Sequence, residues 1–365
     1  MQPQAESEPA VGDGPVEQVG SAGQNRTDKL PRPRFDHLQR LTNHLGVWEH
    51  AHFTTPRPEH GYCTDDNARA LIVVCRQPEA SAGLVQLAQT YLTFLEQAQL
   101  PGGGFHNRRR SDGAWADEVG SDDSQGRALW ALGFVANRGP TPSMRRAGLD
   151  LFTRSSEFAS PYPRSNAYAV LGAAEMLRAA PEHEPAWKML ERCAGRIPVV
   201  PHDARWPWPE DRLAYDNARL PEALLAAGAC TGDDFLLDTG LRLLEWLVGI
   251  ETGRDCFSFT PVGGWAPGEC RPGFDQQPIE AAAMADACSR AFSLTADERW
   301  RDLVERAARW FVGSNDGKAL LYDTKTGGGR DGLTPEGTNL NQGAESTLAA
   351  LAALQQAQAL YDHSD

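Results

Sequence analysis

The chain has 365 residues, a net charge of −14 at pH 7 and a pI near 5.1. Nucleic acids and anionic membrane surfaces both require basic patches, and the only basic run is the three arginines at 108–110, so neither is an expected partner. Seven cysteines without CxxC or Cys/His ligand spacing predict a reducing, cytoplasmic location and no metal, and no other cofactor is expected.

Residues 1–30 are rich in Gln, Glu, Gly, Ser and Pro and contain no aromatic residue. Such a segment cannot bury enough apolar surface to offset chain entropy, so it is predicted to be a disordered N-terminal tail or linker. It lacks the basic and apolar regions of a signal peptide, so none is predicted. The sequence also contains no run of about 18 apolar residues, so no membrane span is predicted. The rest, 31–365, is predicted to form one domain.

Two kinds of helix alternate through that domain. Amphipathic segments, whose apolar residues recur at intervals of three and four, are predicted near 35–45, 83–98, 142–158, 185–196, 235–250 and 296–312. The segments between them are Ala-rich and nearly apolar all round, as at 281–285 and 348–354, which places them inside the protein. Twelve helices in this order predict an all-α (α/α)6 toroid, a closed ring of six helical hairpins around one polar pocket.

The loops that lead into the Ala-rich helices are long, at about 47–63, 100–121, 198–215, 252–275 and 314–340. Long loops in a compact domain are usually functional. They carry many aromatic residues, among them Tyr62 and Trp115, which are candidate substrate contacts. We therefore expect the active face at the N-terminal end of the inner helices.

Paired aspartates open two of the inner helices, Asp65 with Asp66 and Asp122 with Asp123. Glycoside cleavage needs one carboxylic acid to protonate the leaving oxygen and a second carboxylate as nucleophile or base. The alternative is helix capping, because Asp is a favoured N-cap and its charge suits a helix N-terminus. A cap needs only one Asp, so the doubling favours these four as candidate catalytic residues.

The sequence Asp-Asn-Ala-Arg occurs at 66–69 and again at 216–219. Arg69 is a candidate contact to a carboxylate or a sugar hydroxyl, although the favoured role is neutralisation of the crowded acids. Pro221 is expected in the first turn of its helix, which leaves Asp216 in the preceding loop and facing the pocket.

Further candidate sugar contacts follow in the second half of the chain. Trp206, Trp208 and Asp211 lie in a proline-rich loop that suits a sugar subsite, or that is anchored to the core by its tryptophans. Glu280 and Glu345 lie in first turns of inner helices, where the helix dipole alone could account for them.

In architecture, residues 35–361 resemble the six-hairpin, (α/α)6-toroid glycosidase superfamily. Locally, 64–71 (TDDNARAL) is similar to the paired-Asp helix motif of the bacterial α-1,6-mannanase family. In that family the two consecutive Asp residues are the catalytic pair, which implies this role for Asp65 and Asp66. The chain departs from the motif at Arg69, where the family tends to an aromatic residue. Residues 60–69 also resemble modules beside sugar-transferring enzymes in bacteria, which implies such a partner enzyme.

The sequence therefore predicts a carbohydrate-active enzyme, a glycoside hydrolase acting on an oligo- or polysaccharide. A sugar epimerase or a polysaccharide lyase is an alternative that would depend on His or on Tyr and Arg. A non-catalytic glycan-binding module is a third reading, because one toroid supports several chemistries. The histidines lie in loops, whereas carboxylates dominate the inner helix starts, which favours hydrolysis.

Overall fold

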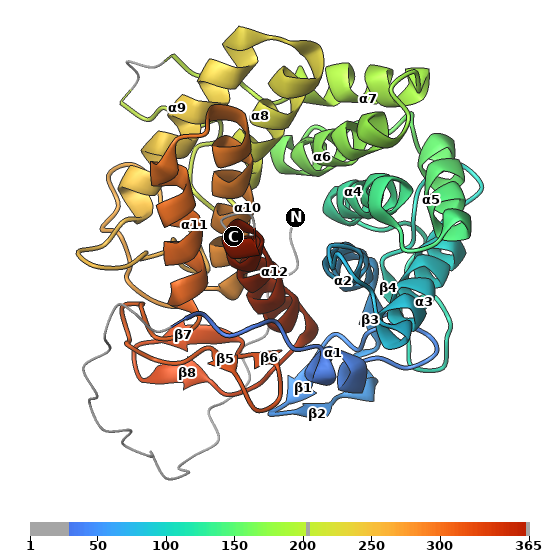
Figure 1. Cartoon of the computed structure of the whole chain (residues 1–365), viewed down its shortest axis with the longest axis horizontal. Helices are drawn as coiled ribbons and strands as arrows, with labels where there is room; N and C mark the ends of the chain where they lie inside the picture. The colour runs from blue at the N-terminus through green and yellow to red at the C-terminus, as the bar shows by residue number, and fades with distance from the viewer. Residues whose placement is uncertain (1–28, 202–204, 363–365) are drawn as a thin grey trace.

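The computed structural model describes residues 29–201 and 205–362. The predicted tail at 1–30 falls outside this range except for its last two residues. The described chain forms twelve α-helices and eight short strands (Figure 1). The helices are α1 (Asp36–Leu41), α2 (Thr64–Cys75), α3 (Ala82–Ala98), α4 (Asp122–Arg138), α5 (Pro142–Arg154), α6 (Pro163–Ala179), α7 (Glu184–Ala194), α8 (Arg219–Thr231), α9 (Asp234–Glu251), α10 (Pro278–Thr295), α11 (Glu298–Trp310) and α12 (Ala344–Asp362).

Six helices form a closed inner ring (Figure 1). Contacts run from α2 through α4, α6, α8, α10 and α12, and α12 contacts α2 again. Outside them, α3, α5, α7, α9 and α11 each pack on the inner helix that precedes them, and α1 packs on α12. The predicted (α/α)6 toroid is therefore confirmed, with its sixth hairpin made from the two ends of the described chain.

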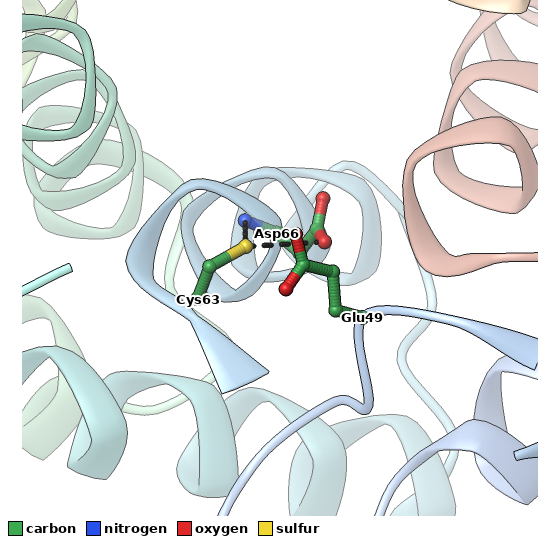
Figure 2. A group of neighbouring side chains, drawn as sticks. All are labelled: Glu49, Cys63 and Asp66. Carbon is green, nitrogen blue, oxygen red and sulfur yellow. Dashed lines mark hydrogen bonds between the residues drawn. The ribbon is translucent and has the colours of Figure 1, made fainter. Parts of the chain in front are cut away.

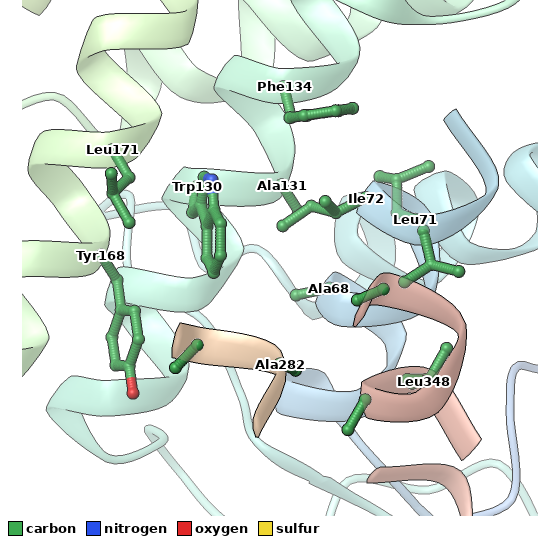
Figure 3. Close-up of a cluster of buried hydrophobic side chains, with 14 of the residues drawn as sticks. Ala68, Leu71, Ile72, Trp130, Ala131, Phe134, Tyr168, Leu171, Ala282 and Leu348 are labelled. Atoms are coloured by element: carbon green, nitrogen blue, oxygen red, sulfur yellow. The ribbon is translucent and has the colours of Figure 1, made fainter. Parts of the chain in front are cut away.

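The inner helices pack closely because their side chains are small. At the contact between α4 and α6, a Cβ on Gly133 would lie 2.0 Å from the carbonyl oxygen of Gly172. Only glycine permits this approach of two backbones. Trp130 and Phe134 of α4 lie among Leu71 and other apolar side chains of neighbouring inner helices (Figure 3).

The outer helices are amphipathic, as predicted. On α11, Trp300 and Val304 are buried against the ring while Glu298 and Arg299 are exposed. The first outer helix is shorter than the predicted 35–45, because the chain becomes extended at Thr42 and turns back to form a β-bridge with Val47.

The eight strands form four two-stranded antiparallel sheets within the loops. They are β1 (Ala51–His52), β2 (Thr55–Pro56), β3 (Tyr62–Cys63), β4 (Arg108–Arg109), β5 (Tyr322–Asp323), β6 (Gly328–Gly329), β7 (Gly332–Thr334) and β8 (Gly337–Asn339). All lie in connections that lead into α2, α4 or α12, which places them at the N-terminal end of the inner ring. Within the described ranges, no helix is both long and apolar enough to cross a membrane.

Candidate active site

A cavity of about 670 Å³ lies at the N-terminal end of the inner helices. First-turn residues of α2, α10 and α12 line it together with the long loops. Its ionisable side chains include both acids and arginines, namely Glu49, Asp65, Asp66, Arg69, Arg127 and Glu345. Acids that accept hydrogen bonds and arginines that donate them suit a ligand with many hydroxyl groups.

The aspartates that open α2 and α4 are not the N-caps of these helices. Cys63 caps α2, its Sγ accepting a hydrogen bond from the Asp66 backbone N–H at 3.4 Å. Ser121 caps α4, its Oγ accepting from the Ser124 backbone N–H at 3.3 Å. The capping explanation therefore does not apply to Asp65 or Asp66, although both still benefit from the helix dipole.

Asp65 and Asp66 both line the cavity, and each contacts a different arginine. Arg127 Nη1 of α4 donates to Asp65 Oδ1 at 2.8 Å. Arg69 Nη1 donates to Asp66 Oδ1 at 2.8 Å, and its Nη2 lies 3.0 Å from Glu345 Oε2 of α12. Two neighbouring carboxylates are thus held in one cavity by separate cationic partners.

These surroundings drive the two pKa values apart. Burial acts to raise the pKa of Asp65, but the Arg127 and Arg69 guanidiniums outweigh it and hold that pKa below its ordinary value. Burial raises the pKa of Asp66 to about 7, because the Glu49 and Glu345 carboxylates counteract the attraction of Arg69. Near neutral pH the pair therefore combines an ionised carboxylate with one that retains a proton, the division needed for acid and base roles.

Glu49, Cys63 and Asp66 form a compact group in the wall of the cavity (Figure 2). Their potential ligand atoms lie within 4.8 Å of one another, so by distance they could hold a metal ion. However, the Cys63 thiol donates to Asp66 Oδ2 at 3.2 Å, and Glu49 is paired with Arg108. Burial raises the pKa of Cys63 well above its usual range, which opposes the thiolate that a metal requires. The group is accounted for as a hydrogen-bonded cluster.

The second aspartate pair is held by hydroxyl groups. Asp123 accepts hydrogen bonds from Ser165 Oγ and Tyr215 Oη, both at 2.5 Å, and Arg127 Nη1 lies 3.8 Å away. Asp122 accepts from Ser160 Oγ at 2.6 Å. Asp123 therefore borders the cavity through Arg127 and Tyr215, whereas Asp122 points to a different loop.

Asp216 and Glu280 are buried, and neither lines the cavity. Asp216 accepts from Tyr168 Oη at 2.6 Å and from Arg219 Nε at 3.1 Å. Glu280 Oε2 accepts from the Asn217 backbone N–H at 3.1 Å, and its Oε1 accepts from the Asp216 backbone N–H. These contacts fix the start of α8, where Asp216 has a left-handed φ of 51°.

The aromatic candidates lie outside the cavity. Trp208 is only 2% exposed and stacks on Trp246 of α9, against which Trp206 also packs. This packing agrees with the alternative in which the two tryptophans anchor their loop to the core. Tyr62 is fully buried against Trp48, Trp115 stacks on His106, and Asp211 is exposed away from the cavity.

Several cavity residues were not anticipated from the sequence. Arg127 lies one helical turn after Asp123, and that spacing was the only available signal for it. Glu49, Tyr215 and Asp331 come from irregular loops, where no periodicity indicates which way a side chain faces.

No protein-family model and no curated protein matches the chain in sequence. Solved structures match its fold. A sugar epimerase from a ruminal bacterium has a TM-score of 0.68 at 12% identity, covering 89% of this chain and 95% of that one. The cellobiose 2-epimerase from Spirochaeta thermophila has a TM-score of 0.64 at 14% identity, covering 90% and 94%. An α-mannanase from Bacteroides thetaiotaomicron has a TM-score of 0.61 at 11% identity, covering 83% and 88%.

These neighbours are carbohydrate-active enzymes of the six-hairpin glycosidase superfamily, and the chain has the (α/α)6-toroid fold of that superfamily. The expected resemblance is confirmed at the level of fold. The neighbours include epimerases as well as glycoside hydrolases, so the fold does not choose between these reactions.

Proposed function

We propose that the protein is a glycoside hydrolase that acts on an oligo- or polysaccharide, with Asp65 and Asp66 as its catalytic carboxylates. The observation that supports this most is their placement, because both line one open cavity from the start of α2 and neither caps the helix. Their opposite pKa shifts support a division of roles between them.

In this mechanism Asp66 donates its proton to the glycosidic oxygen as the bond from that oxygen to the sugar carbon breaks. Asp65, ionised beside Arg127, supplies the negative charge that attacks or stabilises the sugar carbon, and water completes the hydrolysis. Arg69 and Glu345 line the same cavity and are proposed to contact sugar hydroxyls. Asp123 is a further candidate carboxylate, because Arg127 and Tyr215 link it to the cavity.

A sugar epimerase is the second candidate, favoured by the epimerases among the structural neighbours and by one cavity residue, His50. An epimerase moves a proton at carbon and releases no second sugar, so product analysis separates the two reactions. A glycan-binding module would bind sugar and turn over nothing.

The test is release of reducing sugar from a panel of polysaccharides by the wild type and by Asp65→Asn, Asp66→Asn and Asp211→Asn. Asn keeps the size of Asp but cannot carry its charge or transfer its proton. We expect the first two variants to lose about 10²- to 10⁴-fold in kcat with unchanged circular dichroism. Asp211→Asn, which is exposed outside the cavity, should keep wild-type turnover. Near-normal activity of both cavity variants on a confirmed substrate would refute the proposal.

A further inference from the structure

A second cavity, of about 420 Å³, lies at the opposite end of the ring from the candidate active site. Its walls come from the C-terminal halves of α4, α6, α10 and α12, from the turn after α2 and from Glu222 of α8. The volume falls within the range of small-molecule sites. We call it the distal cavity.

The distal cavity is cationic although the protein is strongly acidic. Arg76, Arg138, Arg178 and Arg290 line it, against two glutamates, Glu175 and Glu222. The lining residues alone carry an excess of two positive charges, in a protein whose net charge is −14, and Arg76 among them is paired with the buried Asp286 at 2.8 Å. The helix dipole favours basic residues at the ends of α2, α4 and α6, but it does not account for Arg290, which lies more than one turn before the end of α10.

The acids of this region are already engaged. The Glu222 carboxylate forms ion pairs with Arg219 Nη1 at 2.7 Å and with Arg290 Nη2 at 3.3 Å. The Glu175 carboxylate forms an ion pair with Arg178 Nη1 at 2.9 Å and accepts a hydrogen bond from Asn137 Nδ2 at 2.7 Å.

Arg138 differs from the other three arginines. Its guanidinium lies 5.5 Å from the centroid of the Phe134 ring, and no carboxylate of the described chain is within ion-pair distance. An additional anion would therefore find at least one arginine without a competing carboxylate.

One residue in the wall of the distal cavity carries a buried acceptor. Gln355 of α12 lines the distal cavity and is 6% exposed. Its Nε2 donates to the Val73 carbonyl oxygen at 2.8 Å, whereas its Oε1 has no hydrogen-bond partner among the described residues. A buried polar atom without a partner is costly, so this oxygen calls for a donor such as a hydroxyl group.

We propose that the distal cavity is a second ligand site and that it binds a phosphorylated monosaccharide. Arg138 and Arg290 donate hydrogen bonds to the phosphate, because the geometry of guanidinium groups matches that of phosphate oxygens. A sugar hydroxyl donates to Gln355 Oε1 once the Gln355 amide turns toward the cavity, because that oxygen is buried in the cavity wall. The site shares no lining residue with the catalytic cavity, so the proposal does not rest on the hydrolase assignment.

The test is calorimetric titration of the full chain with glucose 6-phosphate, inorganic phosphate and glucose as probes. We expect glucose 6-phosphate to bind more tightly than either of the others. Arg138→Gln should weaken its binding about tenfold, as expected for the loss of a charge-assisted hydrogen bond. Arg146→Gln on α5 is the matched control, because this arginine is 75% exposed, is paired with Asp150 and lines neither the distal nor the catalytic cavity.

The Arg108→Gln variant tests whether glucose 6-phosphate binds in the catalytic cavity instead, because Arg108 lines that cavity. The proposal expects it to leave the affinity for glucose 6-phosphate unchanged. Weaker binding in Arg108→Gln with unchanged binding in Arg138→Gln would place the phosphate in the catalytic cavity and overturn the proposal. Absence of saturable binding at millimolar glucose 6-phosphate, or equal affinity for glucose, would overturn it as well.

Discussion

At the scale of residues, Asp65 and Asp66 are chemically identical groups at consecutive positions, yet their surroundings differ. Successive residues of a helix point about 100° apart, so Asp65 turns toward Arg127 of α4 while Asp66 turns toward Cys63 and Glu49. Neighbouring charge and not residue type therefore sets which of them is ionised.

The pH dependence of activity follows from this difference. Asp65 must be ionised and its pKa is below the ordinary value, so activity should already be high in mildly acidic solution. Asp66 must be protonated and its pKa is about 7, so kcat/KM should fall as the pH rises through about 7.

Glu49→Gln offers a sharper version of this measurement. The Glu49 carboxylate raises the pKa of Asp66, so removing its charge should lower that pKa and move the alkaline limb of the kcat/KM profile to lower pH. Glu59→Gln, in an exposed position beside Arg57 and outside the cavity lining, should leave the limb in place. An alkaline limb that stays fixed, or moves upward, in Glu49→Gln would argue against Asp66 as the acid.

At the scale of elements, the helices were predictable because their signals are local. Periodic apolar residues marked the outer set and continuous small residues marked the inner set, and together they indicated the ring. The end of α1 was not predicted, since the turn back to Val47 depends on pairing with a residue beyond the helix. The place of Trp208 depends on Trp246 of α9, a tertiary contact that the loop sequence does not encode. The same holds for Glu49, which reaches the cavity from a loop.

The contact between α4 and α6 gives a test of the inner ring. Gly133→Ala would place a methyl group 2.0 Å from the Gly172 carbonyl oxygen, so the two helices must separate. We expect a loss of about 1 to 3 kcal/mol in the free energy of unfolding by urea. Gly249→Ala on α9, where a Cβ meets nothing within 4 Å, should instead gain about 0.5 to 1 kcal/mol. Equal stability of Gly133→Ala and the wild type would mean that the backbones are not in this close contact.

At the scale of the whole molecule, ion pairs connect the two ends of the ring through its interior. In each of these ion pairs the nitrogen and oxygen atoms lie within 3.4 Å of each other, and most of the side chains are buried. From the distal cavity to the catalytic cavity the chain of partners is Arg76, Asp286, Arg219, Asp216, Arg127 and Asp65. Removing one member of such a chain leaves buried charges unpaired, which costs more than the pair itself contributes.

Asp286 is the member whose loss should be most damaging, because it lies between Arg76 and Arg219, at 2.8 Å from each, and is only 3% exposed. We expect Asp286→Asn to lower the free energy of unfolding at pH 7 by about 3 to 5 kcal/mol. Asp238→Asn on α9, which breaks an exposed pair with Arg242, should cost at most about 1 kcal/mol.

The stability difference between Asp286→Asn and the wild type should also depend on pH. Burial opposes ionisation of Asp286, but Arg76 and Arg219 outweigh it and lower its pKa to about 2. A carboxylate with a lowered pKa stabilises the folded state fully above its unfolded pKa of about 3.9 and loses this contribution as the pH falls toward about 2. Urea unfolding of both proteins between pH 7 and pH 3 measures the difference in their free energies of unfolding. This difference should be constant down to about pH 5 and then become smaller. A difference that is absent at pH 7, or that stays constant to the lowest pH at which the wild type is folded, would show that the Asp286 charge does not hold this interior chain together.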